Sequence, residues 1–298
     1  MRTEQELFQI HIERTDVMLK KTTPVILAAL LLAAAVSCKK DEDSHKVTAE
    51  NELTAEFLDV GKADAIILTT SASTVVIDCG EKGDGKEVVK YLEDKEITSV
   101  DYLIITHYDK DHVGGASKLI KSLDVKNVLS PDYEAESDEV DKYKKALSEK
   151  NIEPKLLTED ISFTLDGVEY TVDAPDKKDY GADNDNDFSL VTKVKHGDNT
   201  LLFTGDAMDT RLSEIMDIGH CTLLKVPYHG RKLDKMSEFL DAVSPECAVV
   251  CTSQDEFSGA VQKLLKKNNI TYYATCFNGN ISAVSDGSQI TVTAEKGG

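Results

Sequence analysis

The stretch Thr106-His107-Tyr108-Asp109-Lys110-Asp111-His112-Val113-Gly114-Gly115 places four candidate metal ligands within six residues. It follows an apolar run that begins at Tyr102 and is typical of a buried β-strand, so its polar side chains emerge together at the strand end. Imidazole and carboxylate groups together suit borderline divalent cations, and this density suits two of them. The two glycines allow a tight turn before the next helix. The candidate ligands are His107, Asp109, Asp111 and His112.

Two later apolar strands also end in residues that can bind metal. Residues 201–204 lead to Asp206, and residues 222–226 lead to His229. Asp206 alone could cap the helix that follows it, and His229 alone could be an ordinary loop histidine. Three apolar strands with such endings are much harder to explain in this way, so we predict a metal site. No role is expected for His45, His196 and His220.

Composition limits the classes of function. The 298 residues include 54 acidic and 34 basic side chains, giving a formal net charge of −20. This balance argues against a broad nucleic-acid-binding face, which needs clustered Lys and Arg. A polyanion would have to be attracted by a local cation, for which a bound metal is the obvious candidate. The proportions of hydrophobic and charged residues, 41% and 30%, are those of a globular domain.

Residues 1–37 have the pattern of a secretory signal. The apolar run 24–36 has 13 residues, fewer than the roughly 20 that span a bilayer, and a Lys20-Lys21 pair precedes it. Ala35-Val36-Ser37-Cys38 resembles the lipobox of bacterial lipoproteins, in which the cysteine receives lipid and becomes the mature N-terminus. A buried Ala-rich helix is the alternative.

We therefore expect translation to start at Met18 and Cys38 to be lipidated. The protein would then be extracytoplasmic and held at a bacterial membrane by its lipid anchor. Residues 38–50 are expected to form a flexible tether, and residues 51–298 to form one domain.

Two other features are not expected to carry chemistry. Residues 80–86 match the glycine and lysine spacing of a P-loop, but Glu87 stands where a Ser or Thr should hold Mg²⁺. We interpret them as a glycine-rich turn between a strand and a helix. Cys247 and Cys251 lie in an apolar, strand-like run and are interpreted as small buried residues, not as a disulfide or a zinc site.

Hydrophobic patterning predicts strands and helices in both halves of the domain. The expected strands are 56–60, 65–69, 74–78, 102–106, 190–195, 201–204, 222–226, 248–252 and 270–274. The expected helices are 86–94, 115–122, 139–150, 208–217, 235–243 and 259–267. Residues 131–175 are acidic and polar and are interpreted as a variable insertion. Two strand-then-helix halves predict two sheets packed face to face with helices outside.

The motifs, taken in order, resemble the metallo-β-lactamase fold superfamily and, more narrowly, the hydrolase-like domain of ComEC DNA-uptake competence proteins and its stand-alone relatives. The resemblance covers most of residues 53–295 and implies an α+β fold, a four-layer αββα sandwich. Five segments of this chain are similar to family motifs, and the family's own pattern is given in parentheses after each range. They are 57–65 (F-L-D-V-G-Q-G-D-A), 107–115 (H-x-D-x-D-H-x-G-G), 186–191 (N-x-x-S-L-V), 204–206 (T-G-D) and 224–231 (L-K-V-P-H-H-G-S).

The resemblance also implies roles for individual residues. One divalent ion, Zn²⁺ or Mn²⁺, would be held by Asp111, His112 and His229. A second would be held by a shell that begins with His107 and Asp109, and Asp206 would bridge the two ions. Asp111 is an expected catalytic residue, and the expected substrate contacts are Lys62 and Asn186. Tyr228 is also expected to be catalytic by donating to a substrate oxygen, and its alternative role is only to fill space in the structure.

Some residues depart from the family pattern. Tyr228 stands where the family has the first His of a pair, and Arg231 stands where it has Ser. Lys62-Ala63 replaces Q-G, and residues 251–255 occupy the region of an absent G-H-P segment. One metal position is therefore expected to have fewer protein ligands than is usual in the family.

The leading hypothesis is a metal-dependent hydrolase whose target is a phosphodiester bond in a small molecule or a nucleic acid. A non-catalytic lipoprotein that binds a ligand or partner is the first alternative, favoured by Tyr228 and the absent G-H-P. The complete H-x-D-x-D-H and T-G-D segments disfavour it. A lactam or lactone hydrolase is the second alternative. The sequence does not indicate an oligomeric state.

Overall fold

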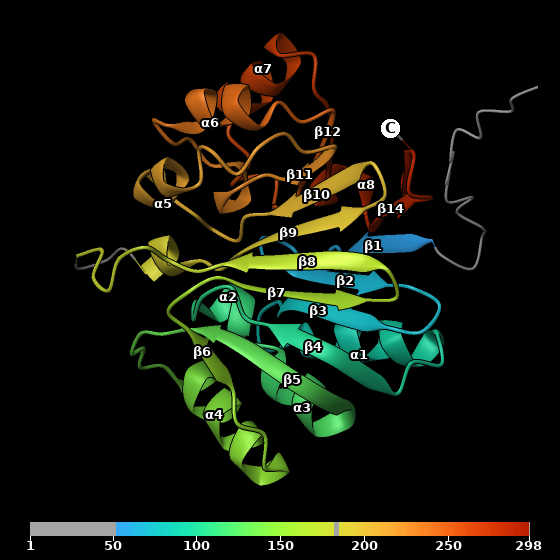
Figure 1. Ribbon diagram of the computed structural model, residues 1–298, viewed down its shortest axis with the longest axis vertical. Coiled ribbons are helices and arrows are strands. Elements are labelled where there is room, and N and C mark those ends of the chain that lie inside the picture. Colours follow the sequence, from blue (N-terminus) through green and yellow to red (C-terminus); the bar gives the residue numbers. More distant parts are fainter. Residues whose placement is uncertain (1–51, 182–184, 298) are drawn as a thin grey trace, which may run out of the picture. The chain divides into compact units, whose positions relative to one another are not determined.

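Two β-sheets lie face to face and carry helices on their outer faces (Figure 1). The computed structural model describes residues 52–181 and 185–297. The predicted signal segment, the lipidation site at Cys38 and the tether up to residue 50 lie outside the described residues. The predicted four-layer αββα sandwich is confirmed.

The first sheet has eight strands in the order β15-β14-β1-β2-β3-β4-β5-β6. These strands are β1 (Leu53–Phe57), β2 (Ala65–Thr69), β3 (Thr74–Cys79), β4 (Ser99–Ile104), β5 (Asp124–Pro131), β6 (Lys155–Leu157), β14 (Ile281–Ser285) and β15 (Ile290–Ala294). The second sheet has seven strands in the order β13-β12-β11-β10-β9-β8-β7. They are β7 (Ile161–Leu165), β8 (Val168–Asp173), β9 (Val191–His196), β10 (Asn199–Phe203), β11 (Leu223–Lys225), β12 (Cys247–Val250) and β13 (Thr271–Ala274).

Eight α-helices and two 3₁₀ turns are found between the strands of the described residues. They are α1 (Gly85–Asp94), α2 (Lys110–Val113), α3 (Ala116–Ser122), α4 (Asp138–Lys150), α5 (Asp209–Glu214), α6 (Met236–Val243), α7 (Gly259–Lys267) and α8 (Thr275–Asn278), with 3₁₀ turns η2 (Asp185–Phe188) and η3 (Tyr228–Gly230). Apolar residues of α1, α3 and α4 pack on the first sheet, and those of α5, α6 and α7 pack on the second.

The core between the sheets comes from alternate residues of the strands. In β1, Leu53, Ala55 and Phe57 are buried, whereas the residues between them are half-buried. Phe57 of the first sheet stacks on Phe203 of the second, with ring centroids 6.0 Å apart. Every residue of β3 is buried, because helices cover its outer side and the second sheet covers its inner side.

Residues 131–175 contain the helix α4 and strands of both sheets, and their interpretation as a variable insertion stays a prediction. Their strand β6 pairs in parallel with β5 at the edge of the first sheet. Strands β7 and β8 form a hairpin, and β8 pairs with β9 in the second sheet. Polar residues suit these strands because they lie at or near sheet edges, where fewer side chains are covered.

Parallel pairing brings several strand ends to one edge of the sandwich. Strand β3 pairs in parallel with β4 and β4 with β5, while β10 pairs in parallel with β11 and β11 with β12. The carboxyl ends of neighbouring parallel strands meet at the same edge of a sheet. The loops after β3, β4, β10 and β11 can therefore contribute side chains to a common site.

The glycine-rich residues 80–86 pack helices together. A Cβ on Gly85 would lie 2.5 Å from the carbonyl oxygen of Gly115, and one on Gly115 would lie 2.0 Å from that of Cys79. The backbone N–H of Gly115 donates to the carbonyl of Gly80 at 3.1 Å. These glycines therefore allow α1 to pack closely against the start of α3 beneath the His107–His112 loop.

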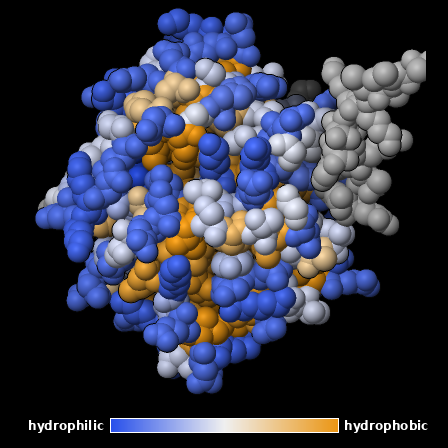
Figure 2. Space-filling model, viewed as in Figure 1, coloured by the Kyte–Doolittle hydropathy of each residue, from blue (hydrophilic) through white to orange (hydrophobic). Residues whose placement is uncertain are grey.

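Hydrophilic side chains cover most of the face shown in Figure 2, with apolar residues visible between them through the middle. This appearance agrees with the net charge of −20. Among the described residues, no helix combines the length and apolar character needed to cross a membrane.

Candidate metal centre

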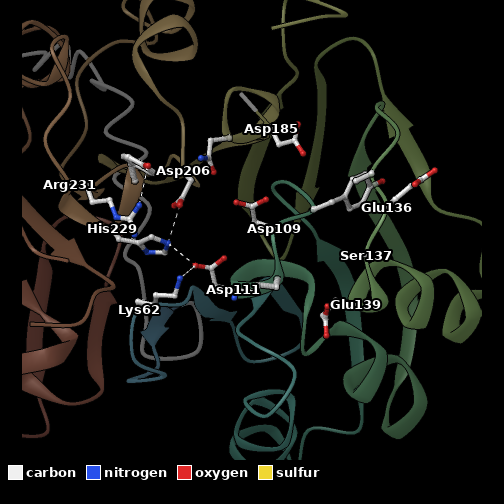
Figure 3. A pocket seen from close by; sticks show the side chains of 15 residues that line it. Lys62, Asp109, Asp111, Glu136, Ser137, Glu139, Asp185, Asp206, His229 and Arg231 are labelled. Carbon is white, nitrogen blue, oxygen red and sulfur yellow. Dashed lines mark hydrogen bonds and ion pairs between the residues drawn. The ribbon is translucent and has the colours of Figure 1, made fainter. Parts of the chain in front are cut away.

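Six of the predicted side chains meet at the strand-end edge. The loop after β4 and the short helix α2 supply His107, Asp109, Asp111 and His112, the loop after β10 supplies Asp206, and η3 supplies His229. His107, His112, Asp206 and His229 are 0–3% exposed, and Asp111 is 8% exposed. Figure 3 shows His229, Asp111 and Asp206 turned toward one another.

In each of the three histidines, the Nδ1 atom lies within hydrogen-bond distance of a neighbouring oxygen on the side away from the site. His107 Nδ1 lies 3.1 Å from Thr106 Oγ1, His112 Nδ1 lies 2.7 Å from Asp78 Oδ2, and His229 Nδ1 lies 3.0 Å from the Cys251 carbonyl oxygen. The Nε2 atoms of all three are buried without a hydrogen bond of good geometry. Histidine ligands of metals typically have this arrangement, with one nitrogen oriented by a partner and the other free for the ion.

The ligand atoms fall into overlapping groups that can hold metal. Asp111, His112 and His229 offer atoms within 4.8 Å of one another, as predicted for one ion. A second such group consists of His107, His112 and Asp206. Asp109 joins neither group, although its Oδ2 lies 3.7 Å from His107 Nε2 and its side chain is 46% exposed. The second position is thus the less enclosed of the two.

Asp206 adjoins both groups through one oxygen, Oδ2, whereas its Oδ1 faces Lys225. Its Oδ2 is 3.0 Å from His229 Nε2 and 3.5 Å from His112 Nε2, and its Oδ1 is 3.5 Å from Lys225 Nζ. Burial opposes its ionisation, but in the metal-free chain His229, His112 and Lys225 together hold its pKa well below the usual value. Asp206 is therefore a carboxylate in position to contact two ions.

Without metal, the histidines are the groups that balance these carboxylates. Burial disfavours a charged imidazole, but Asp206 and Asp78 outweigh it and raise the pKa of His112 to about 10. Burial likewise acts against His229, and Asp206 with Asp111 raises its pKa well above the usual value. Divalent cations can replace these protons, so the donor set fits a metal.

Sequence analysis missed three buried residues behind the ligands. Asp78, at the end of β3, accepts from the Thr106 backbone N–H at 2.9 Å and orients His112. Asp64 pairs with the fully buried Lys225, whose Nζ also donates to the carbonyl oxygen of Gly205 at 2.8 Å. Asp78 could have been found because it is an acidic residue at the end of an apolar strand. Asp64 and Lys225 could have been found because they lie within the family-like segments 57–65 and 224–231.

Ser189 and Arg211 position the loop that carries Asp206. The backbone N–H of Asp206 donates to Ser189 Oγ at 3.0 Å. Arg211 is fully buried and donates from Nε to the Ser189 carbonyl oxygen at 3.1 Å. The neighbouring Asp187 accepts from the backbone N–H groups of Met208 and Arg211 at the start of α5. The 186–191 segment thus supports the Asp206 loop.

An unusual turn presents His229. Tyr228, His229 and Gly230 have positive φ values of 52°, 51° and 71°. Non-glycine residues rarely adopt this conformation, which costs on the order of 1–3 kcal/mol each and is concentrated at functional sites. Gly230 is required because a Cβ there would lie 2.8 Å from Phe257 and Val250. This packing holds the strained turn and directs His229 inward.

A pocket of about 450 Å³ opens beside the ligands. It is lined by the expected catalytic residues Asp111 and Tyr228 and by the expected substrate contacts Lys62 and Asn186. Lys62 Nζ lies 3.2 Å from Asp111 Oδ2. The Oδ1 atom of Asn186 is buried without a hydrogen-bond partner. The structure places these four residues together, and their roles remain predictions.

The residues expected to have no role lie elsewhere. His196 Nδ1 is 2.8 Å from Ser285 Oγ, at the end of the β9–β10 hairpin opposite Asp206. His220 is exposed and pairs with Glu246 at 3.7 Å. The described cysteines form no disulfide. Cys251 is buried as predicted, whereas Cys247, at the start of β12, is only half-buried.

Comparisons with known proteins agree with this geometry. The pattern of the Metallo-beta-lactamase superfamily matches residues 58–254. ComE operon protein 3 of Bacillus subtilis is 26% identical over 66% of this chain and 26% of its own length. Competence protein ComA of Neisseria gonorrhoeae is 25% identical over 85% of this chain and 34% of its own length. The chain thus spans about a quarter to a third of these relatives.

Solved structures show the same fold. A putative metal-dependent hydrolase from Parabacteroides distasonis has a TM-score of 0.52 and 13% identity, covering 75% of this chain and 93% of that one. The metallo-beta-lactamase fold protein YhfI from Bacillus subtilis also has a TM-score of 0.52, with 10% identity, covering 80% of this chain and 99% of that one. At these identities the likeness concerns the fold alone.

Proposed function

Because the chain belongs to the metallo-β-lactamase superfamily and has the fold of a metal-dependent hydrolase, we propose that it is an extracytoplasmic, lipid-anchored hydrolase of phosphodiester bonds. One observation supports the hydrolase part most strongly. Three buried Nε2 atoms, each on a ring oriented from behind, converge on the carboxylates of Asp111 and Asp206. Divalent cations would take the place of the protons that balance these carboxylates in the metal-free chain.

The residues present fit a binuclear centre with unequal positions. Asp111, His112 and His229 would hold one ion, His107 and Asp109 would contribute to the other, and Asp206 would contact both. Divalent ions bound there would lower the pKa of water and neutralise charge that develops on a phosphoryl group. The more exposed Asp109 implies weaker binding at the second position.

The neighbouring side chains can bind and orient a phosphodiester. Lys62 places a cation at the edge of the ligand cluster. Arg231 Nη1 donates to the Tyr228 hydroxyl oxygen at 3.1 Å, which leaves the Tyr228 proton free to be donated to a substrate oxygen. The Asn186 carbonyl oxygen, which lacks a partner, can accept from a hydroxyl or ammonium group of a substrate but not from its phosphate. Lys62 and the Tyr228 hydroxyl support a phosphodiester more directly than a lactam or lactone, which carries no anion at the scissile bond.

Two measurements test the proposal. Purified residues 39–298, reloaded with Mn²⁺ or Zn²⁺ after mild chelation, should contain two ions per chain and hydrolyse simple phosphodiesters. Asp206→Asn should abolish turnover while the protein stays folded, and Asp217→Asn, which removes an exposed carboxylate, should leave turnover unchanged. Folded protein that takes up no metal would refute the hydrolase and leave a non-catalytic binding lipoprotein. Full activity in Asp206→Asn would show that chemistry occurs elsewhere.

The lipid anchor has its own test. Expression of the full chain in a bacterium should label the protein with radioactive palmitate and place it in the membrane fraction. Cys38→Ser should abolish both results. Labelling that persists in this variant would contradict the proposed anchor without affecting the hydrolase.

A further inference from the structure

The pocket beside the metal centre carries opposite charges on its two sides. Lys62 and Arg231 line the side next to His229, whereas Glu136, Glu139 and Asp185 line the other side (Figure 3). The metal-binding residues Asp111 and Asp206 lie between the two groups. We call the first group the cationic wall and the second the acidic wall.

The cationic wall is built to receive an anion. Arg231 donates from Nε to Glu256 and from Nη1 to the Tyr228 hydroxyl oxygen, and its guanidinium carbon lies 5.0 Å from the centre of the Tyr228 ring. Neither hydrogen bond uses Nη2. A guanidinium held in this way is pre-organised for phosphate oxygens, and Lys62 supplies a second positive charge.

The acidic wall comes from the β5–α4 loop, the first turn of α4 and η2. Glu136 is exposed, and Glu139 has only a distant partner, Lys142, at 3.8 Å. Lys110 is the remaining cation among the residues that line the pocket, besides those of the cationic wall. An anionic group placed against this wall would be repelled, whereas an ammonium group would be attracted.

A buried histidine connects the pocket to the metal centre. His229 is 2% exposed and lines the pocket, and its Nε2 lies 3.0 Å from Asp206 Oδ2 without a hydrogen bond of good geometry. A volume of about 450 Å³ suits a small molecule. A nucleic-acid strand carries one charge about every 3.4 Å of its rise, so any phosphates that extend across the pocket would be repelled by the acidic wall.

We infer that the substrate is a small phosphodiester with a single negative charge, whose second substituent carries an amine or quaternary ammonium group. This inference rests on the proposed phosphodiester hydrolysis. The diester anion binds between the metal centre and Lys62 with Arg231, and the ammonium group lies against Glu136 and Glu139. Water cleaves one P–O ester bond, which gives a phosphomonoester and an alcohol.

Three probes distinguish the substrate classes. Glycerophosphoethanolamine carries the ammonium group, glycerophosphoglycerol is of similar size without it, and an eight-residue oligothymidylate is a polyanion. Calorimetric titration of the metal-loaded protein reports binding whether or not hydrolysis follows. We expect the ammonium probe to bind about three- to tenfold more tightly than glycerophosphoglycerol, and the oligothymidylate to bind most weakly. Equal binding of the two glycerol diesters, or tightest binding of the oligothymidylate, would overturn the inference.

Variants assign the preference to the acidic wall. The double variant Glu136→Gln/Glu139→Gln should bind the two glycerol diesters equally and gain affinity for the oligothymidylate. The control Asp138→Asn/Asp141→Asn removes the same charge from the same region at residues that do not line the pocket, and it should keep the wild-type preference. A preference that survives in the first variant, or is lost in the control, would contradict the assignment.

A second pair tests the cationic wall. Arg231→Gln should weaken binding of both glycerol diesters by a similar factor, about three- to tenfold, without changing their ratio. Lys232→Gln, an adjacent exposed cation that does not line the pocket, should not. Binding of the ammonium probe without turnover would refute the proposed hydrolysis but keep the ligand class. Turnover of glycerophosphoglycerol at the rate of the ammonium probe would keep the hydrolase and refute the ligand class.

Discussion

The metal-free protein should lose stability as the pH rises from about 6.5 toward 10. His112 is fully buried, and although burial disfavours its charge, Asp206 and Asp78 raise its pKa to about 10. An unfolded histidine titrates near 6.5, so between these values the folded chain holds a proton that the unfolded chain has released. The stabilisation is fully present below pH 6.5 and is lost as the pH rises through 10.

The size of the effect follows from this difference. A pKa raised from 6.5 to about 10 corresponds to a ceiling of about 4.8 kcal/mol at 1.36 kcal/mol per unit of pKa. Between pH 6.5 and 8, His112 alone should lower the free energy of unfolding by about 1.7 kcal/mol. His229, whose pKa is also raised, changes stability in the same direction. Buried thiols such as Cys79 add to the loss only as the pH approaches 8.5.

Urea denaturation of the chelated protein at several pH values between 6 and 8 measures this loss. With metal bound, the histidines give up their protons to bind the ion, so the extra stability due to metal should instead increase with pH. His112→Gln should reduce the pH dependence of the metal-free chain, with His229 accounting for the remainder, and the exposed control His220→Ala should not change it. A metal-free wild type whose stability does not change from pH 6 to 8 would refute the electrostatic account of the site.

Three further substitutions test the supports of the site. Gly115→Ala should destabilise the protein by at least about 2 kcal/mol in urea denaturation, because the added Cβ would clash with backbone atoms. The control Gly83→Ala adds a Cβ in open space and should cost less than about 1 kcal/mol. Equal costs would contradict the packing argument. Asp78→Asn should weaken metal binding about 10–100-fold in a chelator competition, since it removes the charge that orients His112, and unchanged affinity would show that this contact is dispensable. Lys225→Met should destabilise the metal-free protein by about 3–5 kcal/mol by leaving buried carboxylates unpaired, and adding Asp64→Asn should restore part of the loss; no recovery in the double variant would mean that the pair does not act as a unit.

Local pattern was enough to place most of the fold. The strand at 65–69 and the helix at 259–267 have the predicted bounds, because their apolar residues repeat with a clear period and clear turn residues flank them. Strands β5, β14 and β15 were not predicted, and the hairpin β7–β8 was hidden in a polar region. Residues 168–173 and 290–294 do alternate between more and less buried side chains, as strands with one exposed face should. These strands are short and rich in polar residues, and local composition therefore favoured loops.

The candidate ligand side chains could be predicted from the sequence. His107 to His112, Asp206 and His229 each follow an apolar strand, and chemistry of the donor groups is a local property of residue type. The order of these motifs along the chain also indicated the family, since each motif includes the glycines and apolar residues that its turn requires.

Only the tertiary structure decided which atoms face one another. Asp64 and Lys225 are 161 positions apart in the chain, yet they form a buried pair behind the candidate ligands. The two walls of the pocket combine the β1–β2 loop and the turn after β11 with the start of α4 and η2. Residue type sets what a side chain can bind, but electrostatic and hydrogen-bond energies depend on distance and burial, and these arise only when the two sheets pack together.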